Sequence, residues 1–182
     1  MSAARPLQHN PLVDRRELER LHSQAYSWAL SCTGGRAAEG EDVLQMTYLA
    51  ILEGRARYDG NSSLRTWLFA VIRNIARSGW RLARYRLQRL ARLATFVAAD
   101  EEAHLDTGHA MAGTNEQSQR IIAAWRALPT RQREIVELVF YRELSIAEAA
   151  AVLGISIGTA RLHYERAKTS LRRRFAEQGI EL

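Results

Sequence analysis

Several residues between positions 156 and 169 have the side chains and the spacing needed to read the edges of DNA bases. Arg161 and Arg166 carry guanidinium groups, which can donate paired hydrogen bonds to the O6 and N7 atoms of guanine. These arginines share the outward side of a predicted helix with Gly158, Leu162, Glu165 and Thr169. The pattern favours a helix that enters a DNA major groove. The alternative is an ordinary helical hairpin with a solvated charged face.

A helix-turn-helix between Ser145 and Arg174 is predicted to position these side chains. Ser145 and Glu148 have the spacing of a capping box, in which each side chain accepts a hydrogen bond from a backbone N–H at the helix start. Gly154 is expected to end the first helix, because glycine adopts the left-handed conformation without steric cost. Ser156 can cap the second helix. The inward stripe of that helix is predicted to be Ala160, Tyr164, Ala167 and Leu171.

A second cationic segment, from Asn61 to Arg92, holds eight arginines and no acidic residue. Cations at this density repel one another unless a polyanion screens them, so the segment predicts contact with nucleic acid. Trp67 falls in the apolar stripe of a helix that is predicted to begin near Ser63, and we expect it to lie mainly in the core. Aromatic rings that could stack on extruded bases lie in and beside the segment: Tyr58, Trp67, Phe69, Trp80 and Tyr85.

The helix predicted between Glu39 and Arg55 has one apolar face and one mixed face. The apolar face, which should be buried, consists of Leu44, Tyr48, Ile51 and Leu52. The mixed face carries Asp42, Gln45, Met46, Leu49 and Glu53. Exposed Met46 and Leu49 would indicate a surface for a partner protein. The alternative is that this face is buried against a neighbouring helix.

The periodicity of the chain predicts an all-α protein with two small helical domains joined by a flexible acidic linker. Helices are expected from about Asp14 onward, with breaks at Gly34–Gly35 and at Tyr58–Ser63. After the linker, Pro129 should end one helix, and Thr130 is predicted to cap the next. No run of alternating residues is long enough to predict a strand.

The linker is predicted from its charge. Between Asp100 and Gln119 the chain holds five acidic residues, two glycines and no Lys or Arg, a composition typical of a flexible connection. His104 and His109 lie among these acids. Their spacing is loose for a metal site and no cysteine joins them, so we expect a solvated linker that holds no metal or other cofactor.

The overall composition excludes several function classes. The formal net charge is +6 and the isoelectric point about 10.1, which suggests a polyanionic partner. Cys32 is the only cysteine, so no intrachain disulfide can form and a reducing compartment is expected. No apolar run approaches about 18 residues, so neither export nor membrane insertion is predicted. Gly154 to Gly158 matches the Gly-x-Ser-x-Gly pattern of hydrolases, but a helix rather than a strand precedes it. We therefore predict a protein that is not an enzyme.

Two motifs together resemble the extracytoplasmic-function (ECF) sigma factors of bacterial RNA polymerase. The first runs from Glu41-Asp42-Val43-Leu44-Gln45 through the segment 58–68 to Ile72-Arg73-Asn74-Ile75-Ala76 and looks like sigma region 2. The second runs from Ala127-Leu128-Pro129 through 130–134 to the segment 153–161 and looks like sigma region 4. The resemblance implies a tail at residues 1–13, a region 2 domain at 14–96, a linker at 97–117 and a region 4 domain at 118–182.

The resemblance also implies a role for each surface. A docking face, consisting of Asp42, Gln45, Met46 and Leu49, would bind the clamp helices of core polymerase, and region 4 would contact the polymerase flap. A strand-capture surface would hold the melted −10 element of promoter DNA: Tyr58, Asp59, Gly60, Asn61, Ser62, Ser63, Arg65, Trp67, Arg73, Asn74 and Arg77. A recognition face would read the −35 element: Ser156, Gly158, Thr159, Arg161, Leu162, Glu165 and Arg166. An anti-sigma factor is a further implied partner, and the implied location is the cytoplasm.

Three positions depart from the family pattern. Met46 stands where the family usually has an acidic residue, and Leu162 and His163 stand where Ser and Arg are common. Leucine can contact a thymine methyl group but cannot donate a hydrogen bond, so the family's promoter preferences do not transfer to this chain. Two alternatives remain open from the sequence. One is a stand-alone helix-turn-helix regulator, and the other is a sigma-like decoy that sequesters an anti-sigma factor.

Overall fold

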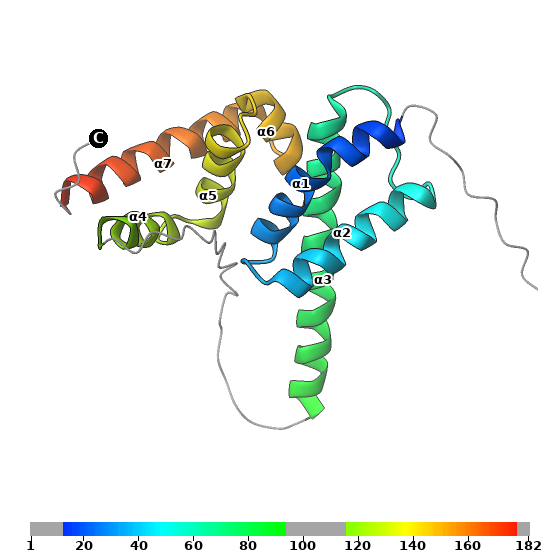
Figure 1. The fold of residues 1–182 in the computed structure, drawn as a ribbon. Helices are drawn as coiled ribbons and strands as arrows, with labels where there is room; N and C mark the ends of the chain where they lie inside the picture. The colour runs from blue at the N-terminus through cyan, green and yellow to red at the C-terminus, as the bar shows by residue number, and fades with distance from the viewer. Residues whose placement is uncertain (1–12, 94–115, 178–182) are drawn as a thin grey trace, which may run out of the picture.

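The computed structural model describes residues 13–93 and 116–177, and their regular structure consists entirely of helices (Figure 1). The N-terminal domain contains α1 (Arg15–Cys32), α2 (Ala37–Leu52) and α3 (Leu64–Leu93). The C-terminal domain contains α4 (Glu116–Arg126), α5 (Thr130–Val136), the π-helical segment η1 (Glu137–Tyr141), α6 (Ile146–Leu153) and α7 (Ile157–Glu177). The predicted linker, 97–117, lies outside the described residues except for its last two, which begin α4.

The N-terminal domain is built around Trp28 of α1. Its indole Nε1 donates a hydrogen bond to the Phe69 carbonyl at 3.0 Å, and the two rings stack with centroids 5.9 Å apart. The Asp14 side chain accepts a hydrogen bond from the backbone N–H of Arg16 and so caps α1. The surrounding core consists of Ala25, Ala29, Leu44, Ile51, Leu64, Leu68 and Ile72.

Two residues of this domain lie on faces that the periodicity did not predict. Phe69 is completely buried, so the expectation that its ring could stack on a base was wrong. Leu52 was expected in the core, but it is the last residue of α2 and its side chain is 56% exposed. Here helical periodicity identified the buried stripe but not the point at which α2 leaves the core.

The C-terminal domain packs short helices around small residues. Ala150 of α6 and Ala160 of α7 are buried, which allows these two helices to approach closely. The predicted cap at Thr130 was wrong. Pro129 occupies the N-cap position without a side-chain hydrogen bond, and Thr130 is the first residue of α5. Other core positions are Leu128, Ile135, Leu138, Ala149, Val152, Leu153 and Ala167.

The two domains pack directly against each other. In Figure 1, α6 of the C-terminal domain lies beside α3 of the N-terminal domain, and the two helices are in contact. Among the described helices, none is both long enough and apolar enough to cross a membrane. The residues that are predicted to contact DNA thus lie on two domains that are in contact with each other.

Candidate nucleic-acid interface

The helix-turn-helix has the local geometry that its sequence predicts. Ser145 Oγ accepts a hydrogen bond from the Glu148 backbone N–H at 3.2 Å, and Glu148 Oε2 accepts one from the Ser145 backbone N–H at 2.9 Å. Gly154 ends α6 in the left-handed conformation, with φ of 62°. Ser156 Oγ then accepts a hydrogen bond from the Thr159 backbone N–H at 3.1 Å, which caps α7. Three local signals therefore place α7 relative to α6.

The recognition face of α7 is open to solvent. Leu162 is 48% exposed, and every other member of the face is also exposed. Lys168 Nζ lies 2.8 Å from Glu165 Oε1, so the charge of Glu165 is paired within α7 itself. The guanidinium groups of Arg161 and Arg166 stand on an accessible helix face near its start, where they could reach base edges or phosphates.

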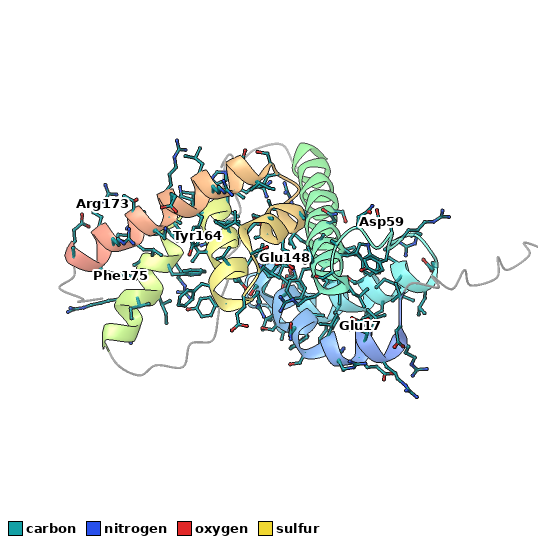
Figure 2. All side chains as sticks on the ribbon, turned by 90° about the horizontal axis from the view of Figure 1, so that it is seen from above. Glu17, Asp59, Glu148, Tyr164, Arg173 and Phe175 are labelled. Atoms are coloured by element: carbon teal, nitrogen blue, oxygen red, sulfur yellow. The ribbon has the colours of Figure 1, made fainter. Side chains whose placement is uncertain are left out.

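The loop from Tyr58 to Ser63 is folded by its own side chains. Asp59 accepts hydrogen bonds from the Asn61 backbone N–H at 3.1 Å and from Asn61 Nδ2 at 2.7 Å, and these bonds lower the pKa of Asp59. Between them Gly60 has φ of 77°, a conformation that favours glycine. The Tyr58 hydroxyl donates to the Ser62 carbonyl and so closes the loop. Figure 2 shows Asp59 on the side of the N-terminal domain away from the C-terminal domain.

Trp67 fixes this loop to α3. Its Nε1 donates to the Arg57 carbonyl at 3.0 Å, and its ring lies against the Tyr58 ring with centroids 5.2 Å apart. The ring also packs against the hydrophobic core while remaining partly exposed. The expectation that Trp67 belongs mainly to the core is thus only partly confirmed. An aromatic pair at the base of a preformed loop could support an extruded base.

The cationic residues of the strand-capture surface do not share one environment. Arg65 is partly exposed, whereas Asn74 and Arg77 are exposed. Arg73 is only 3% exposed, and it forms two hydrogen bonds with the carboxylate of Glu134 in the C-terminal domain, at 2.9 and 3.0 Å. Arg65 thus follows the loop at the start of α3, Asn74 and Arg77 lie further along the same helix, and Arg73 is engaged with the C-terminal domain.

The docking face lies on the solvent side of α2. Asp42 and Gln45 are exposed, and Met46 and Leu49 are 46% and 47% exposed. The alternative, that this face is buried against a neighbouring helix, is therefore wrong. Leu52 extends the exposed apolar surface toward a groove between α1 and α2. Apolar side chains exposed next to one another on a helix are typical of a protein interface.

The contact between the domains contains residues that sequence reasoning missed. Glu134 lies in α5 among arginines, and Glu137 is 1% exposed and pairs with Arg142 at 3.1 Å. Arg142 also reaches across to α1, where its Nη1 donates to Ser27 Oγ at 2.9 Å. The only sequence signal was the presence of acidic residues on a helix with an apolar stripe, which more often marks a solvated face.

Comparison with known proteins places both domains in one family. The sequence pattern described as Sigma-70 region 2 matches residues 17–86, and the pattern described as Sigma-70, region 4 matches residues 118–171. The first match contains the docking face and the strand-capture surface, and the second contains the recognition face. This arrangement defines a sigma factor of the sigma-70 class.

Individual relatives narrow the class. The ECF RNA polymerase sigma factor SigC of Mycobacterium tuberculosis is 34% identical over 72% of this chain and 67% of its own length. The RNA polymerase sigma factor HrpL of Pseudomonas syringae is 30% identical over 75% of this chain and 73% of its own length. The fold is shared with the sigma factor RpoE of Bartonella quintana, solved with the anti-sigma factor NepR, with a TM-score of 0.65, 24% identity and coverage of 89% and 96% of the two chains. The chain belongs to the ECF sigma factors of bacterial RNA polymerase.

Membership of this family settles the general activity. The chain directs transcription initiation by RNA polymerase, binds DNA, and belongs to a family without catalytic activity of its own. A stand-alone helix-turn-helix regulator, which was open from the sequence, does not account for the match to region 2.

Proposed function

We propose that the docking face, the strand-capture surface and the recognition face divide the work of promoter opening. The docking face binds the clamp helices of core polymerase, the strand-capture surface holds the melted −10 element, and the recognition face reads the −35 element. The observation that carries this proposal is the separation of the surfaces. The docking face lies on α2, the preformed loop begins the strand-capture surface before α3, and the recognition face lies on α7 of the other domain.

The chemistry of the docking face supports a protein partner rather than DNA. Met46 and Leu49 are about half exposed on a helix face that also carries Asp42. A carboxylate would repel phosphates, whereas apolar side chains gain free energy when a protein surface covers them. Methionine adapts its shape to the surface it meets, so Met46 could fill a contact that an acidic residue makes in other family members.

The strand-capture surface has the combination that single-stranded DNA requires. The Tyr58 and Trp67 rings offer stacking surfaces, and internal hydrogen bonds preform the loop between Asp59 and Ser63. Arg65 and Arg77 lie beyond it on α3, where they could hold phosphates. A preformed loop reduces the ordering cost of capturing an extruded base.

The recognition face would enter the major groove with the first turns of α7. Its exposed arginines could read guanine, and Leu162 could contact a thymine methyl group. The remainder of the C-terminal domain would contact the polymerase flap, and so hold α7 at the distance of the −35 element.

An anti-sigma factor is a further proposed partner. Support comes from the structural neighbour with the same fold, which was solved as a complex of a sigma factor with an anti-sigma factor. Addition of the product of an adjacent gene to a reconstituted transcription reaction tests this. Loss of the transcript in proportion to the added protein is expected, and an unchanged transcript would reject that protein as the inhibitor.

Site-specific photocrosslinking in the reconstituted holoenzyme tests all three assignments together. A photoreactive amino acid at Leu49 should crosslink to the largest polymerase subunit, one at Ser62 to the non-template −10 strand, and one at Leu162 to −35 duplex DNA. Glu17, an exposed residue of α1 outside the three surfaces, provides the control. Crosslinks from Leu49 to DNA, or from Leu162 to the polymerase clamp, would reject the proposed division.

A further inference from the structure

Glu165 lies near the middle of the recognition face, where α7 would approach the bases of a major groove most closely. Successive residues of an α-helix are about 100° apart around its axis. Leu162 and Glu165 therefore lie about 30° to either side of the middle of the face, and Arg161 and Arg166 lie about 70° to either side of it. The Glu165 side chain is 62% exposed. A carboxylate thus stands at the centre of a surface that is proposed to meet DNA.

A negative charge at this position opposes binding to most DNA sequences. The two phosphate backbones that border a major groove repel a carboxylate. Glu165 is the only acidic residue of the recognition face, in a chain whose formal net charge is +6. Its presence lowers the affinity for DNA unless its charge is offset within α7 and a base donates a hydrogen bond to it.

A lysine and a tyrosine on the same helix hold this carboxylate. Lys168 Nζ lies 2.8 Å from Glu165 Oε1 and 4.9 Å from the centroid of the Tyr164 ring. Tyr164 is half-buried and packs against the hydrophobic core. The ammonium group is therefore held from two sides, by the carboxylate and by the face of an anchored ring. An isolated ion pair on a helix surface orients its side chains only weakly, but this pair is connected to the core through Tyr164.

The carboxylate that Lys168 holds can still accept a hydrogen bond from DNA. A carboxylate has about four lone-pair positions, so the contact with Lys168 leaves others available. In the major groove cytosine presents only a donor, its N4 amino group, whereas guanine and thymine present acceptors that repel a carboxylate. Adenine presents a donor beside an acceptor and is therefore intermediate. An acceptor at the position of Glu165 favours cytosine over the other three bases.

We infer that Glu165 reads a cytosine of the −35 element, and that Lys168 is a positioning residue, which directs the Glu165 carboxylate and offsets its charge. The inference rests on the proposed function, in which the recognition face reads that element. The arginines on either side attract DNA, whereas Glu165 discriminates among sequences by repelling the bases that offer it only acceptors. Tyr164 contributes indirectly, by holding Lys168.

The role of Glu165 is tested by selection of duplex DNA with the reconstituted holoenzyme. The probe is a promoter fragment that the wild-type holoenzyme opens, with one turn of its −35 region, about 10 base pairs, randomised. The wild type should enrich cytosine at one position. Glu165→Gln should lower the ratio of cytosine to adenine there at least about fivefold, because a carboxamide pairs with both N6 and N7 of adenine. Glu177→Gln makes the same charge change at the last residue of α7 and should leave every preference unchanged.

The role of Lys168 is tested in the same selection by Lys168→Met, which keeps an unbranched apolar side chain and removes the charge. The preference for cytosine should fall about two- to fivefold, the range that an exposed ion pair contributes, while preferences at other positions stay the same. Arg173→Met is the matched control, because Arg173 also pairs with a glutamate of α7, at 3.9 Å, but lies beyond the recognition face. Figure 2 shows Arg173 toward the C-terminal end of α7 and Tyr164 nearer its middle. An unchanged preference for cytosine in Lys168→Met, whatever the loss of overall affinity, would overturn the positioning role.

The outcomes separate this inference from the proposed function. If the wild-type holoenzyme selects no sequence in the −35 region, the recognition face is rejected as the reader of that element. A defined −35 preference without cytosine, or one that Glu165→Gln leaves unchanged, would overturn only the reading of cytosine by Glu165. The side chains of Glu165 and Lys168 are 62% and 33% exposed, so each variant should keep the helical circular dichroism of the wild type.

Discussion

The two candidate DNA-contacting surfaces differ in how much of each is accessible to DNA. The recognition face on α7 is exposed along its whole set of residues, and its supporting turn is held by two caps and Gly154. The strand-capture surface has an equally well-formed loop, but Arg73 is 3% exposed and paired with Glu134. One surface could meet duplex DNA as it stands, whereas the other needs a rearrangement before all its cations can act.

This difference fits the DNA that each surface is proposed to meet. A −35 element is read as a duplex, which exists before the polymerase acts. A melted −10 strand exists only once opening has begun, so a surface that becomes complete later loses nothing by being partly covered earlier. Burial of Arg73 against a carboxylate would also limit non-specific binding of the strongly basic free chain to nucleic acid.

The largest expected effect concerns the docking face, because both DNA surfaces depend on it. Met46→Asp combined with Leu49→Asp should abolish binding to core polymerase, since an unpaired carboxylate in a buried apolar contact costs several kcal/mol. The fold should be unchanged because both side chains are about half exposed. Gel filtration with core polymerase measures the effect. Leu162→Asp, which adds a carboxylate on α7 instead, should retain the complex, and normal co-elution of the double variant would reject the docking face.

The next prediction tests whether the exposed recognition face reads the edges of DNA bases. Arg161→Ala should weaken binding to the cognate −35 sequence by about 1–3 kcal/mol and relax specificity at one base pair, if Arg161 reads a base edge. Arg173→Ala, on the exposed surface later in α7, is the matched control. Holoenzyme binding to a set of single-base promoter variants measures both. An equal loss on every sequence would identify Arg161 as a phosphate contact and not a base-reading residue.

The two surfaces also differ in how well they could be predicted from the sequence. The helix-turn-helix depends on signals a few residues apart, namely Ser145 with Glu148 and Gly154 in its turn, and the structure confirms them. The burial of Arg73 depends on Glu134, which lies 61 residues away along the chain. The sequence placed Arg73 among the arginines that were expected to contact nucleic acid, but the periodicity of a helix carries no information about which domain covers one of its faces. The exposure of Met46 and Leu49 could not be predicted for the same reason. Periodicity left open whether their face of the helix binds a partner protein or is buried against a neighbouring helix.

A smaller effect is expected from the loop of the strand-capture surface. Tyr58→Phe keeps the ring that lies against Trp67 but removes the hydroxyl that donates to the Ser62 carbonyl. Loss of one such bond costs about 1 kcal/mol, which corresponds to about a fivefold slower formation of the open complex. Permanganate footprinting of unpaired thymines against time measures this rate. Tyr26→Phe in α1 removes a hydroxyl outside the loop and should leave the rate unchanged, and equal slowing by both variants would mean that the loop bond has no specific role.

The smallest effect is a pH dependence at Glu148, the residue that belongs to both the helix-turn-helix and the domain contact. Its pKa is lowered from an ordinary value of 4.5, chiefly by hydrogen bonds from Ser145. A carboxyl whose pKa is lower in the folded chain stabilises the fold above its unfolded pKa, and this stabilisation is lost as the pH falls through the lower, folded value. Glu148→Gln can keep the capping geometry without ionising. Its melting temperature should therefore decrease less steeply below about pH 4.5 than that of the wild type. The corresponding difference in the free energy of unfolding should be no larger than the contribution of a helix cap, about 1 kcal/mol. Thermal unfolding followed by circular dichroism measures both chains. Parallel pH profiles would show that ionised Glu148 stabilises neither α6 nor its contact with Thr66, and the acidic coverage of α3 would then depend on Glu134 alone.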